Sequence, residues 1–259
     1  MKTIDIRGRH DVGEIIGLAW RLYARNFGPM FLIALTTAPL QMLAAVVQDR
    51  IDSPDNAALA AAPFQLASVL VTIIAAGALI HATNEAASGT RPDFARSIDA
   101  AIEHFGRLFT TSLLAGVLSL LSLIAFPYFV IRWTFSTWAV MLEDKRNWSA
   151  LDASSSIVKG AWWRTFGILI VIVLVVIGPS VLASAAQALP ALAAATIASA
   201  AAALIIPFGV AAQTLLYFDL RARKAASEIA LPELSPESDS ASPPPDDPGR
   251  DSEDRPADQ

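Results

Sequence analysis

The sequence predicts an all-α, polytopic membrane protein whose six transmembrane helices form three units, each an interfacial helix followed by a hairpin of two spans. Hydrophobic residues make up 54% of the 259 residues and charged residues only 17%, whereas soluble domains carry about 25% charged residues. The apolar residues gather in runs close to the length that crosses about 30 Å of hydrocarbon. Lys and Arg concentrate in every second segment between these runs.

The apolar runs define the predicted spans. Pro39 in the first and Pro207 in the sixth should each kink the helix, because proline removes a backbone hydrogen bond. The third and fourth runs are short and are joined at Phe126-Pro127, which predicts a hairpin that crosses the bilayer; a re-entrant hairpin stays open as the alternative. The predicted spans cover residues 27–47, 65–86, 108–125, 128–143, 165–187 and 191–219.

The basic residues predict the orientation, since Lys and Arg in short loops favour the cytoplasmic side. The segment before the first span contains five of them, and the segments after the second, fourth and sixth spans each contain several. The gap 48–64 contains only Arg50, and the gap after the fifth span contains none. Both termini are therefore expected on the cytoplasmic side of a bacterial cytoplasmic (inner) membrane.

Each unit is predicted to begin with an amphipathic helix that lies in the cytoplasmic interface. An apolar stripe at helical spacing precedes the first span; it comprises Ile15, Ile16, Leu18, Ala19, Leu22 and Tyr23. The same order, an amphipathic segment, then Arg-x-Phe, then an apolar run, occurs three times. The three Arg-x-Phe positions are Arg25/Phe27, Arg107/Phe109 and Arg164/Phe166.

Two regions are predicted, an integral membrane domain over residues 1–225 and a disordered acidic cytoplasmic tail over residues 226–259. The tail holds ten of the 24 acidic residues but only two of the 19 basic ones, and it is rich in Pro and Ser. A segment of this composition has too little apolar surface to offset the entropy of ordering.

Arg132 is the first candidate functional residue, because a charge placed within a predicted span is costly. Its guanidinium matches phosphate oxygens, so Arg132 is a candidate contact for a lipid headgroup or another anion at the outer leaflet. The alternative is structural: Arg132 extends to the interface or caps carbonyls near Pro127. Asp49 is the one carboxylate near enough in the predicted threading to pair with it.

A second candidate is a polar cluster at the inner ends of the spans, made of His81, Glu85, Glu143 and Asp219. A His-Glu pair can transfer protons. The alternative is that these groups pair with basic neighbours and hold the inner face together; Lys159, Arg164 and Arg221 are the partners that the sequence offers.

Several classes of chemistry lack support. The chain has no cysteine, which removes thiolate nucleophiles and cysteine-ligated metals. One His and one Glu on a helix are too few for a metal site. There is no phosphate-binding glycine loop, dinucleotide fingerprint or nucleophile elbow, and the dispersed basic residues suit anionic headgroups rather than nucleic acid. No cofactor, metal, catalytic residue or enzymatic activity is therefore predicted.

The stretch FPYFVIRWTFSTWAVMLED, followed by SALDASSSIVKGAWWRTFGILI, and the later TLLYFDLRAR carry a resemblance. Together they resemble the membrane domain that precedes some bacterial glycerophosphodiester phosphodiesterases, and related six-span bacterial membrane proteins. The resemblance covers about residues 10–224. In those phosphodiesterases the chemistry belongs to a separate barrel domain, and this chain has no residues for one, so the resemblance implies a membrane module without that activity.

The sequence thus favours a non-catalytic scaffold or accessory module in the cell envelope. The alternative is a transporter or lipid-handling protein that contacts anionic headgroups or substrates through Arg132. Membrane lipids are the expected partners, with anionic headgroups at the cytoplasmic face, and a protein partner or a homo-oligomer stays open.

Overall fold

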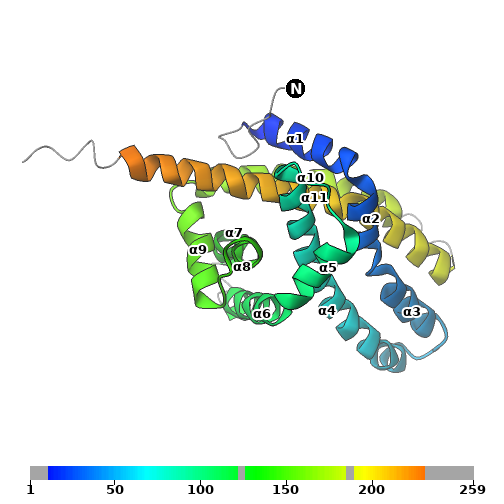
Figure 1. The fold of residues 1–259 in the computed structure, drawn as a ribbon. Coiled ribbons are helices and arrows are strands. Elements are labelled where there is room, and N and C mark those ends of the chain that lie inside the picture. The colour runs from blue at the N-terminus through cyan, green and yellow to red at the C-terminus, as the bar shows by residue number, and fades with distance from the viewer. Residues whose placement is uncertain (1–10, 122–125, 185–189, 231–259) are drawn as a thin grey trace, which may run out of the picture. The chain divides into compact units, whose positions relative to one another are not determined.

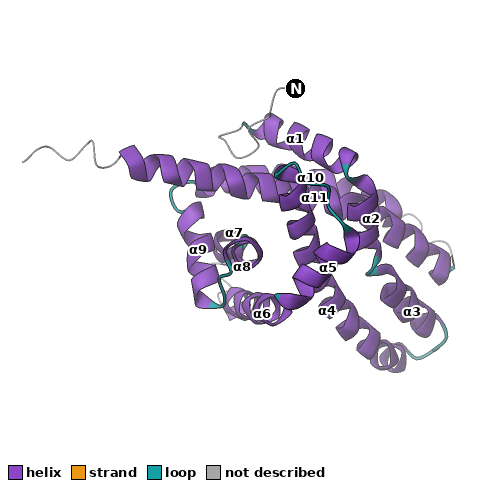
Figure 2. Ribbon diagram, in the orientation of Figure 1, coloured by secondary structure: helices purple, strands orange, loops and turns teal. Residues whose placement is uncertain are grey.

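The computed structural model describes residues 11–121, 126–184 and 190–230, and within these ranges all regular structure is helical (Figures 1 and 2). The predicted all-α class is confirmed. The described residues up to Lys224 form one compact unit, and a second unit begins at Ala225. The helices are α1 (Val12–Arg25), α2 (Phe27–Leu35), α3 (Ala38–Asp49), α4 (Pro54–Ala87), α5 (Phe94–Glu103), α6 (Phe105–Leu121), α7 (Phe126–Trp133), α8 (Ser136–Glu143), α9 (Trp148–Val158), α10 (Trp162–Ser184) and α11 (Ala191–Ala230).

Three helical segments in the described ranges are long and apolar enough to cross a membrane. They are Phe27–Asp49, Asp55–Ala87 and Leu192–Glu228. Helices α9 and α10, which are bent by 99°, add a fourth if the pair is one broken span. Three to four candidate spans indicate a helical membrane protein, fewer than the six predicted. Residues 122–125 and 185–187, which belong to the third and fifth predicted spans, lie outside the described residues.

The two prolines behave differently. Helix α2 ends at Leu35, and α3 starts at Ala38 with Pro39 as its second residue, so the chain breaks just before Pro39, where the sequence predicts a kink. The hydroxyls of Thr36 and Thr37 donate to backbone carbonyls three residues earlier, at 2.7 and 3.0 Å. Helix α11 remains a single helix through Pro207.

The prediction of one helix over residues 128–143 is wrong. The structure has two helices of eight residues each, α7 and α8, separated at Thr134 and Phe135. The hydroxyl of Ser154 on α9 accepts the backbone N–H of Phe135 at 3.1 Å and donates to the carbonyl of Arg132 at 2.8 Å. A side chain from another helix therefore satisfies backbone groups at the break, which is why an apolar segment can interrupt its helix there.

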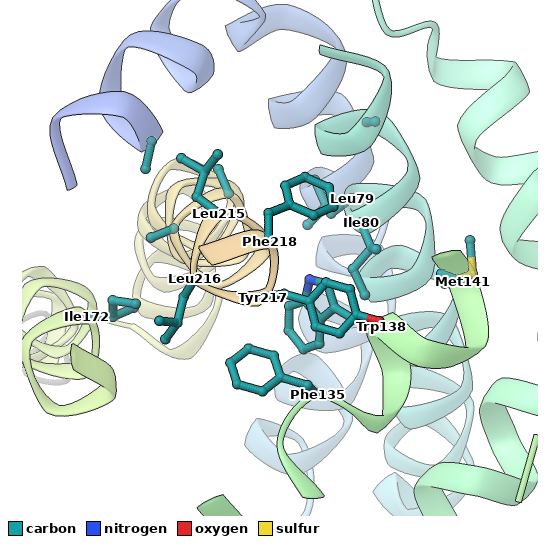
Figure 3. Packing of buried hydrophobic residues seen from close by; sticks show 14 of the residues in the cluster. Leu79, Ile80, Phe135, Trp138, Met141, Ile172, Leu215, Leu216, Tyr217 and Phe218 are labelled. Atoms are coloured by element: carbon teal, nitrogen blue, oxygen red, sulfur yellow. The ribbon is translucent and has the colours of Figure 1, made fainter. Parts of the chain in front are cut away.

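The core collects around α11. Figure 3 shows Leu216 directed toward Ile172 on α10, Tyr217 toward Trp138 on α8, and Phe218 toward Leu79 on α4. The indole of Trp138 on α8 donates to the Thr214 hydroxyl at 2.9 Å. The residues of the other helices in this packing are Leu79, Ile80, Phe135, Trp138, Met141 and Ile172.

Helix α1 is amphipathic as predicted, but its apolar stripe packs on protein. Five of the six predicted stripe residues are buried in the core, and the sixth, Ile16, is partly buried against it. The hydroxyl of Tyr23 donates to the carbonyl of Leu204 on α11 at 2.7 Å, and Trp20 meets Phe208 edge-on at 6.0 Å between centroids. Because Leu204 and Phe208 lie well inside a candidate span, α1 lies alongside α11 rather than only in the interface.

Helix α11 continues to Ala230, so residues 226–230 are helical where the sequence predicted the start of a disordered tail. The rest of that tail, residues 231–259, lies outside the described residues.

Candidate functional site

Two of the predicted carboxylates form ion pairs with the last third of α11, on different faces of that helix, and we call these two groups together the ionic cluster. Glu143 ends α8, and Asp219 lies on α11 between Tyr217 and Arg221, both of which contact Glu143. The ionic cluster comprises Glu143, Lys145, Arg164, Tyr217, Asp219, Arg221 and Arg223.

Asp219 is the more buried of the two carboxylates, with a side-chain exposure of 0% against 15% for Glu143. Its Oδ2 accepts from Nη2 of Arg164 at 3.0 Å. Nε of Arg223, one turn later on α11, lies 3.1 and 2.9 Å from the two carboxylate oxygens. Since Arg164 stands in the first turn of α10, this carboxylate joins α10 to α11.

Glu143 joins α8 to α11 in the same way. Nζ of Lys145 lies 3.0 Å and Nη1 of Arg221 3.3 Å from its carboxylate oxygens, and the Tyr217 hydroxyl donates to it. Arg164 and Arg221 are thus partners of the predicted carboxylates, as the structural alternative proposed. Lys159 is not one: it is exposed at the end of α9 and has no ion pair with a described residue.

His81 and Glu85 form a separate group on α4. Glu85 pairs with Arg96 on α5, Oε1 to Nη1 at 2.8 Å, and Nδ1 of His81 lies 3.9 Å from the other carboxylate oxygen of Glu85. The four predicted residues therefore do not meet in one place. Arg96 has no marker in the sequence beyond its charge, because its pairing depends on how α5 packs against α4.

Sequence reasoning gave Asp144 no separate role, although it links α6 to the end of α8. His104 Nε2 lies 3.1 Å and Arg107 Nη1 2.9 Å from its Oδ1. These hydrogen bonds, that of His104 first and that of Arg107 second, lower the pKa of the Asp144 carboxyl below its ordinary value. Asp144 also has a left-handed backbone, φ 54°, which Asp and Asn tolerate better than most residues.

Arg132 lies on α7, away from Asp49. Its Nη1 donates to the hydroxyl of Tyr128 at 3.0 Å, and its guanidinium lies 5.8 Å from the centre of that ring. It forms no ion pair with a described residue. The Tyr128 ring stacks on Trp162, the first residue of α10, with centroids 6.0 Å apart. This places Arg132 near the end of α10 that carries Arg164, not near the opposite end that the predicted threading requires.

Within the described ranges, no group of three or more His, Cys, Asp or Glu side chains is placed to hold a metal ion. The carboxylates of the ionic cluster each pair with two basic side chains on neighbouring segments, which makes them structural links between helices. Comparisons with protein-family models, with curated proteins and with solved structures found no match for this chain.

Proposed function

We propose that this chain is a multi-pass protein of the bacterial cytoplasmic membrane that serves as a non-catalytic scaffold or accessory module in the cell envelope, with both termini in the cytoplasm. The observation that carries the proposal is the ionic cluster. Its carboxylates link α8, α10 and α11 and are engaged by basic groups and the Tyr217 hydroxyl. They therefore hold helices together, and their partners are protein groups rather than a substrate. The resemblance to the membrane domains of certain phosphodiesterases agrees with this role.

A stability measurement tests this use of the cluster. Replacing Asp219 with Asn removes the charge that Arg164 and Arg223 share in a buried site, and breaking a buried ion pair costs about 3–5 kcal/mol. We expect Asp219→Asn to lower the unfolding free energy in detergent by that amount. Asp152→Asn is the matched control, because Asp152 is an exposed carboxylate on α9 and should change stability by less than about 0.5 kcal/mol.

A variant Asp219→Asn that unfolds like the wild type would contradict the structural role. Asp219 would then be a candidate for a role in chemistry or transport.

The number of crossings belongs to the same proposal. The alternation of basic residues supports six crossings. The stacking of Tyr128 on Trp162 supports four, with α6, α7 and α8 as a re-entrant hairpin. With six crossings, Tyr128 would lie at the outer face of the membrane and Trp162 at the inner face, about 30 Å apart, and the two rings could not touch. We favour the re-entrant form. Both forms contain an even number of crossings and keep the two termini on one side.

A cysteine at Tyr128 separates the two forms. The chain has no cysteine of its own, so Tyr128→Cys provides a single thiol. We expect an impermeant thiol reagent to reach it only after the inner membrane is opened. Labelling in intact cells would support six crossings instead.

A further inference from the structure

Arg132 has a charge that no carboxylate in the described part of the chain neutralises. Its guanidinium makes one side-chain hydrogen bond, to the neutral hydroxyl of Tyr128, and no carboxylate among the described residues pairs with it. Arg96, Arg107, Arg164, Arg221 and Arg223 all form ion pairs. A partly buried guanidinium without an anion is costly in a membrane protein, and its remaining N–H groups are arranged to grip an anion at two points.

Trp162 provides a second, independent observation. Its indole Nε1 is buried and has no hydrogen-bond partner among the residues that the structure describes, although an unpaired buried donor costs about 1–3 kcal/mol. The ring that carries this N–H stacks on Tyr128, whose hydroxyl accepts from Arg132. One aromatic contact therefore joins the unsatisfied donor of Trp162 to the unpaired cation of Arg132.

The surroundings indicate a site at the headgroup level of the bilayer. Trp163, beside Trp162, is 77% exposed, and Trp is enriched where hydrocarbon meets headgroups. Lys159 lies three residues before Trp162, is exposed and has no ion pair among the described residues. Arg132 is also fixed at its backbone, because its carbonyl accepts from the buried hydroxyl of Ser154.

We propose that Arg132 and Trp162, held together by Tyr128, bind the phosphate of an anionic glycerophospholipid of the cytoplasmic leaflet. Arg132 provides the charge and a fork of N–H donors, and the Trp162 indole provides one further donor. The site rests on the membrane location proposed above and adds a ligand to it. It also moves Arg132 from the outer leaflet, where the sequence placed it, to the leaflet in which α10 begins.

Lipid retention tests the site directly. The purified full-length chain is reconstituted in nanodiscs that contain equal amounts of phosphatidylglycerol and phosphatidylethanolamine. Native mass spectrometry of the protein released from the nanodiscs then measures which lipids stay bound. We expect the wild type to retain phosphatidylglycerol in preference. Arg132→Gln should weaken this retention at least tenfold. Trp162→Phe keeps an aromatic ring for the stack but lacks the N–H, and it should weaken retention by a smaller factor.

Arg91→Gln is the control, since Arg91 is likewise without an ion pair among the described residues but is fully at the surface. Equal loss of phosphatidylglycerol in Arg91→Gln and Arg132→Gln would overturn the site and indicate general attraction between charges. Retention unchanged in both Arg132→Gln and Trp162→Phe would overturn it too, as would binding of inorganic phosphate without lipid. Thermal unfolding of each variant separates loss of the site from loss of the fold.

The two proposals fail in different ways. A chain that needs no detergent to leave the membrane fraction would contradict the membrane location itself. A chain that needs detergent for extraction and is folded, but whose lipid retention does not depend on Arg132, would contradict only the phosphate site.

Discussion

The hydroxyl of Ser154 stabilises the break between α7 and α8. Its side chain is fully buried and bridges the break between α7 and α8, accepting from Phe135 and donating to Arg132. Backbone groups in an apolar environment have no water to bond to, so an unpaired one is expensive. A serine from a distant helix turn thus permits a bend that the apolar sequence around it would otherwise oppose.

We therefore expect Ser154→Ala to destabilise the protein. The substitution leaves the Phe135 N–H without its partner, which costs about 1–3 kcal/mol. Ser155→Ala is the control, since the Ser155 hydroxyl bonds to a carbonyl within its own helix and its loss should cost clearly less. Chemical unfolding in detergent, followed by circular dichroism, compares the two; equal stabilities would show that the bridge contributes nothing.

Asp144 predicts a pH dependence outside the spans. Its pKa is lowered in the folded protein, first by the hydrogen bond with His104 and then by that with Arg107. A lowered carboxyl pKa contributes stability that is present above the ordinary value of about 3.9 and is lost as the pH falls through the lower folded value. Asp144→Asn should remove this part of the acid dependence while keeping a residue that tolerates positive φ. Unfolding midpoints measured between pH 2 and 6 should converge for the two proteins at the acid end; parallel curves would contradict the assignment.

At the scale of elements, α4 packs closely against α5, α6 and α8 at Gly77. A Cβ added to Gly77 on α4 would lie 2.8 Å from Leu108 Cδ1, 3.3 Å from Ala101 Cβ and 3.4 Å from Met141 Sδ. Leu108 and Ala101 are fully buried and have little room to move. The absence of a side chain at residue 77 therefore sets how closely these helices approach, as small residues do between membrane helices.

Gly77→Ala should destabilise this contact by about 1–3 kcal/mol, the usual cost of overpacking. Gly116→Ala is a suitable control, because a Cβ at that position in α6 meets nothing within 4 Å and alanine favours the helix. The melting temperature in detergent should fall for the first variant and stay equal or rise for the second. A fall of similar size in both would point to a general effect of changing glycine in helices.

The sequence was informative about elements where apolar length alone decides. The first, second and sixth predicted spans correspond to Phe27–Asp49, Asp55–Ala87 and Leu192–Glu228, and the break near Pro39 follows from its missing N–H. The fourth was wrong because composition does not reveal a helix break that Ser154 stabilises from another element. The stripe of α1 was found, but amphipathicity states which face is buried and not whether lipid or α11 covers it.

In the candidate sites too, the sequence indicated some contacts and not others. The basic partners of Glu143 and Asp219 could be foreseen for Arg164 and Arg221, because unpaired charges near span ends need counter-charges. The contact of Tyr128 with Trp162, 34 positions apart in the sequence, could not be foreseen, since it depends on the path of the hairpin. That one contact moves Arg132 to the other end of the bundle.

At the scale of the whole molecule, the account rests on a membrane protein with both termini on one side. An even number of crossings gives this arrangement with either form of the hairpin, so the orientation is a separate question from the count. The gap between the first two candidate spans should face outward, and the end of α11 should face the cytoplasm.

Cysteine labelling tests this central claim most directly. Asn56 is exposed at the start of α4, and Ala225 is exposed near the end of α11; each is replaced singly by Cys in a chain that has no other thiol. We predict that an impermeant thiol reagent labels Asn56→Cys in intact cells and labels Ala225→Cys only after the inner membrane is permeabilised. Labelling of Ala225→Cys in intact cells, with Asn56→Cys protected, would contradict the orientation and with it the cytoplasmic placement of the ionic cluster and of Arg132.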